Sequence, residues 1–166
     1  AVGMNGTIVK KPKQNTPWVA QTSGTGNDLY GVFFSNVNKG IAVGANGTIL
    51  RTENGGANWT SVPSGTSNTL FSVYFNDANI GYIAGANGTC LKTVTGGAYW
   101  FALDPGTTLD LHAIFVPVVN VAYIVGNNGL ISNTTLGGTA WSFRTVNAHK
   151  PTEPANNAVN QMLDVY

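Results

Sequence analysis

The feature that most constrains the fold is a repeat with a period of 41 residues. Glycine and tryptophan both recur at this spacing, and the tryptophan series contains all four tryptophans of the chain. The two series are Gly3, Gly44, Gly85 and Gly126, and Trp18, Trp59, Trp100 and Trp141. A period of about 40 residues is typical of propeller blades and of helical repeats. Residues that lie 41 positions apart are called equivalent below.

Each repeat has the composition of strands and tight turns rather than of helices. In the second repeat, Leu29–Phe34 is a continuous apolar run, which is typical of a strand buried on both faces. Gly40–Gly44 predicts a second strand, and Asn46-Gly47 predicts a hairpin turn because both residues accept a positive φ. Residues 48–52 and 59–62 predict the third and fourth strands. The sequence therefore predicts an all-β fold, a β-propeller of four 41-residue, four-stranded blades.

The whole chain is predicted to be a single propeller domain, with four blade units and one insertion loop. The units are residues 1–28 with 162–166, 29–69, 70–110 and 111–146, and the loop is 147–161. The chain begins with the pattern of a second strand and ends with that of a first strand. We therefore expect Met162–Tyr166 to pair with Ala1–Gly3, because ring closure removes exposed sheet edges. The result is a closed four-bladed ring or, alternatively, part of a larger ring.

Two motifs within the repeat carry a resemblance to known proteins. The turn from Thr52 to Trp59, Thr-x-Asn-Gly-Gly-x-x-Trp, resembles the Asp-box hairpin of bacterial neuraminidase repeats. The longer pattern joins Leu-x-x-Val-x-Phe to Gly-x-x-x-Gly-x-Asn-Gly-Thr-Ile-Leu-x-Thr and then to this turn. It is similar to the propeller family of the photosystem II assembly and stability factor, and to repeats of secreted bacterial surface proteins. The resemblance implies a bacterial extracellular or cell-surface location or, alternatively, the periplasm or thylakoid lumen.

The residues needed for catalysis are missing from the sequence pattern. A resemblance to sialidases implies three arginines around the substrate, but the chain has only Arg51 and Arg144, and lysine does not replace a bidentate arginine. Other glycosidases need two apposed carboxylates. Asp28 and Asp110 are equivalent acids before first strands, and we interpret them as turn-stabilising residues. We predict no enzyme and no catalytic residue.

Cofactors and several classes of partner are also excluded by composition. The single cysteine, Cys90, is equivalent to Ile8, Ile49 and Ile131, so it is predicted to be a small core residue and not a metal ligand. We predict no metal and no cofactor. The net charge is only +1 and charged residues are 9% of the chain, which disfavours nucleic acid and anionic membranes. Apolar runs all fall short of the roughly 18 residues of a spanning helix, so no membrane insertion is expected.

Candidate binding residues are those that depart from the repeat. His112 replaces an apolar position, held elsewhere by Tyr30, Phe71 and Leu163; a wall histidine with a hydrogen-bonded ring is the simpler interpretation. The insertion adds a Pro- and Asn-rich loop, and insertions in repeats tend to map to a functional face. In a four-stranded meander this loop shares one end with the Asn-Gly turns. The candidate binding residues on that face are Asp28, Asp110, His112, His149, Lys150 and Glu153.

The leading functional hypothesis is a non-enzymatic binding or scaffolding propeller of a secreted or surface-exposed bacterial protein. Its partner is expected to be a protein or glycan at the face formed by residues 147–157. A first alternative is a self-associating structural subunit of an extracellular assembly, with half-rings pairing as a homo-oligomer. A second is a chaperone like the photosystem assembly factor. A sialidase-like glycosidase is the last.

Overall fold

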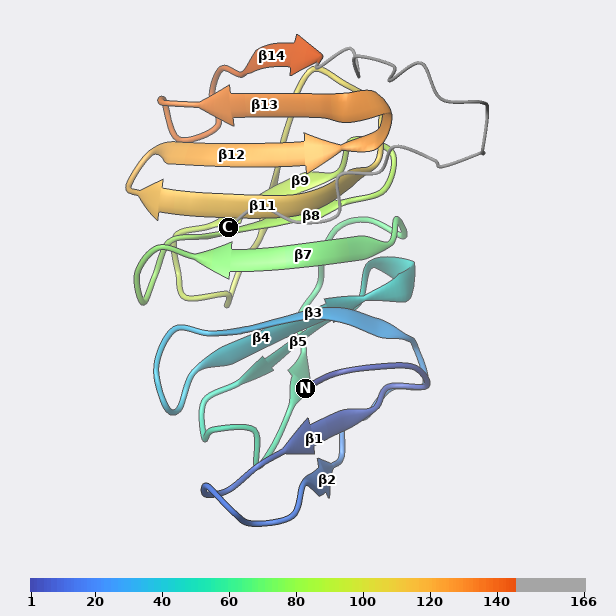
Figure 1. The fold of residues 1–166 in the computed structure, drawn as a ribbon. Coiled ribbons are helices and arrows are strands. Elements are labelled where there is room, and N and C mark those ends of the chain that lie inside the picture. The colour runs from blue at the N-terminus through green and yellow to red at the C-terminus, as the bar shows by residue number, and fades with distance from the viewer. Residues whose placement is uncertain (146–166) are drawn as a thin grey trace, which may run out of the picture.

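The structure, a computed structural model, describes residues 1–145, which form consecutive antiparallel β-sheets (Figure 1). Unit 1 has a two-stranded sheet, and units 2, 3 and 4 each have four strands in chain order. The strands are β1 (Ile8–Lys10) and β2 (Val19–Gln21); β3 (Leu29–Phe34), β4 (Gly40–Gly44), β5 (Ile49–Thr52) and β6 (Thr60–Ser61); β7 (Leu70–Phe75), β8 (Gly81–Gly85), β9 (Cys90–Thr93) and β10 (Phe101–Leu103); β11 (Leu111–Val118), β12 (Val121–Gly126), β13 (Leu130–Thr134) and β14 (Ser142–Thr145). The predicted all-β propeller architecture is confirmed.

The sheets are arranged with their first strands side by side. β3, β7 and β11 run across the middle of the molecule, and units 1 and 4 lie at opposite ends of the described arc (Figure 1). The bounds of β3 and β4 are those that the sequence predicts. β11 extends to Val118, and a register shift between Phe115 and Val118 accommodates Pro117 within the strand. The predicted strand Met162–Tyr166 and the insertion loop lie outside the described residues.

The Asn-Gly turns have the predicted hairpin geometry. Asn46 and Gly47 have φ values of 55° and 65°, and the other three Asn-Gly pairs are also positive. In this turn, Thr48 N donates to Ala45 O at 3.0 Å, and Gly44 N donates to Thr48 O at 3.0 Å. A Cβ at position 47 would lie 1.9 Å from the carbonyl oxygen of Thr66. Glycine is therefore required by contact as well as by φ.

A buried threonine hydroxyl holds the second turn of each four-stranded unit. Thr52 Oγ1 accepts hydrogen bonds from Gly56 N at 2.9 Å and Asn54 N at 3.3 Å. Asn54 Oδ1 accepts from Asn58 N at 2.9 Å. Thr93 and Thr134 repeat the hydroxyl bonds in units 3 and 4. The hydroxyl is present in all three turns, together with a Gly-Gly pair of positive φ.

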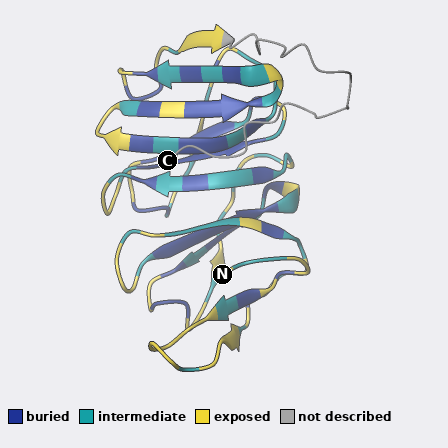
Figure 2. Cartoon of the chain, in the orientation of Figure 1, coloured by how far each residue is buried: buried dark blue, intermediate teal, exposed yellow. Residues whose placement is uncertain are grey.

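The core consists of three apolar clusters, each between two consecutive units. Burial is most complete in the second strands β4 and β8, all of whose residues are buried (Figure 2). Ile41 of unit 2 packs in the cluster shared with unit 3, and Tyr82 of unit 3 packs in the cluster shared with unit 4. Trp59, Trp100 and Trp141 pack against the three clusters. Every interior boundary is thus built from the same two faces: a forward face, which meets the next unit, and an outer face, which meets the preceding one.

Cationic side chains also connect consecutive units. Lys10 Nζ donates to Gly55 O at 2.7 Å, and Lys92 Nζ donates to Gly137 O at 2.8 Å. Arg51 Nε makes the equivalent bond from unit 2 to unit 3 at 3.1 Å. Each bond joins the third strand of one unit to the glycine-rich turn of the next. These bonds join consecutive sheets, and they use three of the few charged residues of the chain.

Candidate functional site

The two predicted acidic residues each hold the Asn-Gly turn of their own unit, at the point where the chain passes into the next unit. Asp28 Oδ1 accepts a hydrogen bond from Asn5 N at 2.8 Å, and Asp110 Oδ1 accepts one from Asn87 N at 2.8 Å. The aspartates precede β3 and β11, and β7 lies between these two strands. Each carboxylate is therefore engaged with a different turn, as the turn-stabilising interpretation predicts.

His112 is connected to Asp110 through Asn127, a residue that the sequence analysis did not single out. Asn127 Nδ2 donates to Asp110 Oδ2 at 3.4 Å. The amide oxygen of Asn127 can only accept, so the 2.7 Å contact with His112 requires a hydrogen on Nε2 of the ring. This bond fixes the orientation of the imidazole. Two of the predicted site residues, Asp110 and His112, are thus brought into one hydrogen-bonded group. His149, Lys150 and Glu153 lie outside the described residues.

His112 also ends a row of aromatic rings that crosses the inner strands. The ring centroids of Phe71 and His112 are 5.3 Å apart, and those of Tyr30 and Phe71 are 5.9 Å apart. Tyr30 is 51% exposed, so the row is accessible from solvent. The equivalence of positions 30, 71 and 112 is the sequence signal for this row. The side chains of this row are suited to stacking and hydrogen bonding rather than to the cleavage of a covalent bond.

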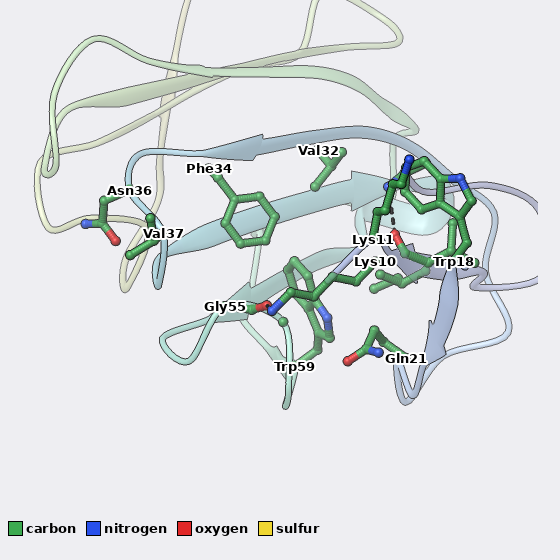
Figure 3. Close-up of a pocket in the computed structure, with 14 residues that line it drawn as sticks. Lys10, Lys11, Trp18, Gln21, Val32, Phe34, Asn36, Val37, Gly55 and Trp59 are labelled. Carbon is green, nitrogen blue, oxygen red and sulfur yellow. Dashed lines mark hydrogen bonds between the residues drawn. The ribbon is translucent and has the colours of Figure 1, made fainter. Parts of the chain in front are cut away.

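A cavity of about 540 Å³ lies where unit 1 meets unit 2 (Figure 3). Unit 1 contributes cationic and aromatic side chains, and unit 2 contributes mostly apolar ones. The labelled lining residues are Lys10, Lys11, Trp18, Gln21, Val32, Phe34, Asn36, Val37, Gly55 and Trp59. Trp18 is 58% exposed, and Phe34 is 42% exposed. The cavity can therefore receive a large apolar side chain beside the ammonium group of Lys11.

The cavity exists because unit 1 has no first strand among the described residues. In the next boundary, Phe33 of β3 stacks on Phe75 with the ring centroids 5.9 Å apart, and Phe75 is 5% exposed. Phe34 is the equivalent of Phe75, but no described strand covers it. The cavity consequently has the position of a missing inner strand. The sequence predicts that Met162–Tyr166 supplies the first strand of this unit, and its pattern gives no indication of a cavity.

Residues 1–145 offer little for metal or covalent chemistry. They contain no group of three or more His, Cys, Asp or Glu side chains that could hold a metal ion. Burial raises the pKa of the Cys90 thiol to about 12, so the thiol is protonated at neutral pH. Within the same residues, no helix is long and apolar enough to cross a membrane.

The repeated antiparallel sheets and the apolar clusters shared by consecutive units define the chain as a repeat β-propeller. The family profile described as photosynthesis system II assembly factor YCF48 matches residues 9–100 and 58–162. The two matches together cover most of the chain, and the protein belongs to this family. Among curated proteins, none matches the chain.

Solved structures share the fold. The structure described as YCF48 bound to D1 peptide is 25% identical with a TM-score of 0.70, over 86% of this chain and 46% of that one. YCF48 from Cyanidioschyzon merolae is 24% identical with a TM-score of 0.63, over 72% and 38%. A GH74 enzyme from Niastella koreensis is 19% identical with a TM-score of 0.64, over 81% and 26%, and this likeness concerns the fold alone. The chain therefore spans less than half the length of the two YCF48 structures.

Proposed function

We propose that this chain is a non-enzymatic, peptide-binding propeller that acts as a photosystem II assembly factor. The observation that carries the proposal is the family match, together with a family structure that is bound to a D1 peptide. The partner class is accordingly a protein segment. The place of action that fits this role is the thylakoid lumen. The scaffold of a bacterial cell surface stays a prediction from the sequence.

The cavity between units 1 and 2 is the proposed binding site. Exposed aromatic side chains such as Phe34 and Trp18 are common anchors for partner segments, because they bury a large apolar area with little loss of conformational freedom. The cavity occupies the place of an inner strand, so the bound segment is expected to be extended. A large apolar residue of the segment would take the position that Phe33 has against Phe75 at the next boundary.

Lys11 supplies the polar part of the proposed recognition. Lys10 is already engaged, since its Nζ donates to Gly55 O at 2.7 Å, and it therefore shapes the cavity wall. Lys11 lines the cavity and is exposed. An acidic side chain or a terminal carboxylate of the bound segment would pair with this ammonium group.

The test is a titration of the chain with a fluorescently labelled D1 peptide, followed by anisotropy. Phe34→Ala is expected to weaken binding about tenfold, which corresponds to about 1.4 kcal/mol. Phe101→Ala is the matched control, because Phe101 is 46% exposed and lies outside the cavity. No binding by the unaltered chain would contradict the proposed function. Equal loss in both variants would contradict the cavity as its site.

Two further variants locate the site more closely. His112→Leu tests the aromatic row and the hydrogen bond to Asn127, and we expect it to leave the affinity unchanged. A chain that ends at residue 161 tests whether Met162–Tyr166, which has the pattern of an inner strand, competes for the cavity. Tighter peptide binding by the shortened chain would show competition. A loss of binding in His112→Leu would instead move the site to the row.

A further inference from the structure

A second hollow, which we call the groove, lies at the boundary between units 1 and 2. Its volume is about 760 Å³, and of the described residues Trp59 alone lines both the groove and the peptide cavity proposed above. One wall is the loop of unit 1 around Gly24, and the other is the Asn46-Gly47 turn with residues 60–66 of unit 2. Both walls belong to the interior of the chain, so the groove does not depend on the chain ends.

Hydrogen bonds join the two walls of the groove. Asn27 of unit 1 makes this connection, since its Nδ2 donates to Thr48 Oγ1 at 2.8 Å and its Oδ1 accepts from Asn46 Nδ2 at 3.2 Å. The walls also have internal bonds, such as the one that Ser64 Oγ donates to Thr66 O at 3.0 Å. The groove is therefore formed in the free chain, which lowers the entropic cost of binding a partner.

The equivalent place between units 3 and 4 is filled by an aromatic ring. Phe143 on β14 lies over Gly106 in the loop of unit 3, so that a Cβ added to this glycine would be 2.9 Å from Cζ of the ring. The equivalents of these two residues are Ser61 and Gly24, and both line the groove. A Cβ added to Gly24 meets nothing within 4 Å. The groove is thus the place of a ring that unit 2 does not supply.

The lining of the groove indicates which kind of ring fits. The described residues that line it are all uncharged, so an ionised group buried there would lose hydration without gaining a charged partner. Trp59 and Val62 provide apolar contact. Thr60 and Ser61 on β6 are exposed and provide hydroxyl groups. This combination suits a neutral aromatic side chain, including one that carries a hydroxyl group.

We propose that the groove is a second protein-binding site, which takes the Tyr or Phe side chain of a partner segment beside Gly24. The bound ring occupies the place that Phe143 has between units 3 and 4. A protein segment is the favoured partner because Phe143 is itself carried by a strand, so a ring on an extended backbone fits such a place. Neither the family match nor the peptide cavity is needed for this site.

At the boundary between units 2 and 3 the same place has a different chemistry. Ala102 is the equivalent of Ser61, and a Cβ added to Gly65 also meets nothing within 4 Å. The equivalent of Pro63 is Asp104, so the lining of this place carries a charge. We therefore assign the ring site to the groove between units 1 and 2, and Ala102 offers a position for a matched control.

The first experiment titrates the isotopically labelled chain with the capped peptide Gly-Thr-Tyr-Thr-Gly and follows the amide signals by NMR. Shifts are expected at Gly24 and Ser61. A matched peptide with leucine in place of tyrosine should bind at least about fivefold more weakly, because it lacks the ring. Equal affinity of the two peptides, or no shift at either residue, would overturn the proposal. So would shifts that a methyl glucoside causes and the tyrosine peptide does not.

The second experiment fills and opens the site by substitution. Ser61→Phe should weaken binding of the tyrosine peptide at least about tenfold, because the added ring fills the groove as Phe143 fills its own place. Ala102→Phe makes the same change in unit 3 and should leave the affinity unchanged. Phe143→Ser opens the place between units 3 and 4, so the peptide should cause new shifts at Gly106.

Three results would each contradict the proposed site: unchanged affinity in Ser61→Phe, an equal loss in Ala102→Phe, or no new shifts at Gly106 in Phe143→Ser. Circular dichroism checks that the variants fold, and the Phe143→Ser result decides if Ser61→Phe does not. Ser61 lies outside the lining of the peptide cavity, so Ser61→Phe should still bind the D1 peptide. The two proposed sites can therefore fail independently.

Discussion

The hydroxyl of Thr93 offers the sharpest test of how the blades are held. The side chain is 0% exposed, and Oγ1 accepts hydrogen bonds from Thr95 N and Gly97 N, both at 3.1 Å. Thr93→Val keeps the shape of the side chain but leaves these two donors without the hydroxyl. Leaving a buried donor unsatisfied costs about 1–3 kcal/mol. Since Thr95 N is only partly buried, we expect the free energy of unfolding to fall by about 2–4 kcal/mol in total.

Thr93→Ser provides the opposite perturbation. It keeps the oxygen and removes one buried methyl group, which costs about 1 kcal/mol with the small cavity included. Urea unfolding followed by tryptophan fluorescence gives both values from the transition midpoints at unchanged m. Thr60→Val on exposed β6 is the control, with an expected change within about 0.5 kcal/mol. A Val variant as stable as the Ser variant would refute the reasoning, because apolar packing would then hold the turn.

Three further predictions concern other parts of the fold. Burial raises the pKa of the Cys90 thiol to about 12, so a thiol reagent at pH 8 should react only with the unfolded chain. Above about pH 8.5 the thiol of the unfolded chain loses a proton that the thiol of the native chain keeps. The free energy of unfolding in urea titrations should therefore fall as the pH rises. Gly47→Ala should lower the free energy of unfolding by at least about 2 kcal/mol. Gly65→Ala should lower it less, because Gly65 has a φ of 75° but nothing lies within 4 Å of a Cβ added there. Equal shifts of the melting temperature would contradict the proposed carbonyl clash at position 47. Lys92→Met should lower the free energy of unfolding by about 1–2 kcal/mol by removing the bond to Gly137 O, and an unchanged midpoint would show that this bond contributes nothing.

The architecture could be predicted from sequence because its determinants are local and repeated. Asn46-Gly47 indicates a hairpin by backbone preference alone, and the apolar run Leu29–Phe34 indicates a strand. The predicted burial of that strand on both faces is wrong, because only Leu29 of β3 is buried. The family could likewise be predicted, because the spacing of these motifs resembles that of the family. The predicted burial of Cys90 is confirmed for the same reason, since its equivalents are isoleucines.

The candidate site could be predicted only in part, because its contacts join residues far apart in the chain. The bond from Lys10 to Gly55 spans 45 positions and has no sequence signature of its own. Asn127 was missed because an asparagine beside an Asn-Gly turn resembles any other turn residue. The cavity near Phe34 depends on which strand is missing beside it, a property of neighbouring units. The exposed Trp18 differs from the other three tryptophans for the same reason, and no periodic pattern distinguishes it.

The bonds at each boundary also bear on how such chains change length during evolution. Asp28 holds the Asn-Gly turn of its own unit, whereas Lys10 holds a turn of the next unit, so these hydrogen bonds act both within a unit and across the boundary to its neighbour. Duplication or loss of a segment one repeat long leaves every tie with an equivalent partner. A change of any other length separates donors from acceptors at two boundaries at once. Selection for stability therefore admits whole units far more readily than fragments, wherever in the repeat the break falls.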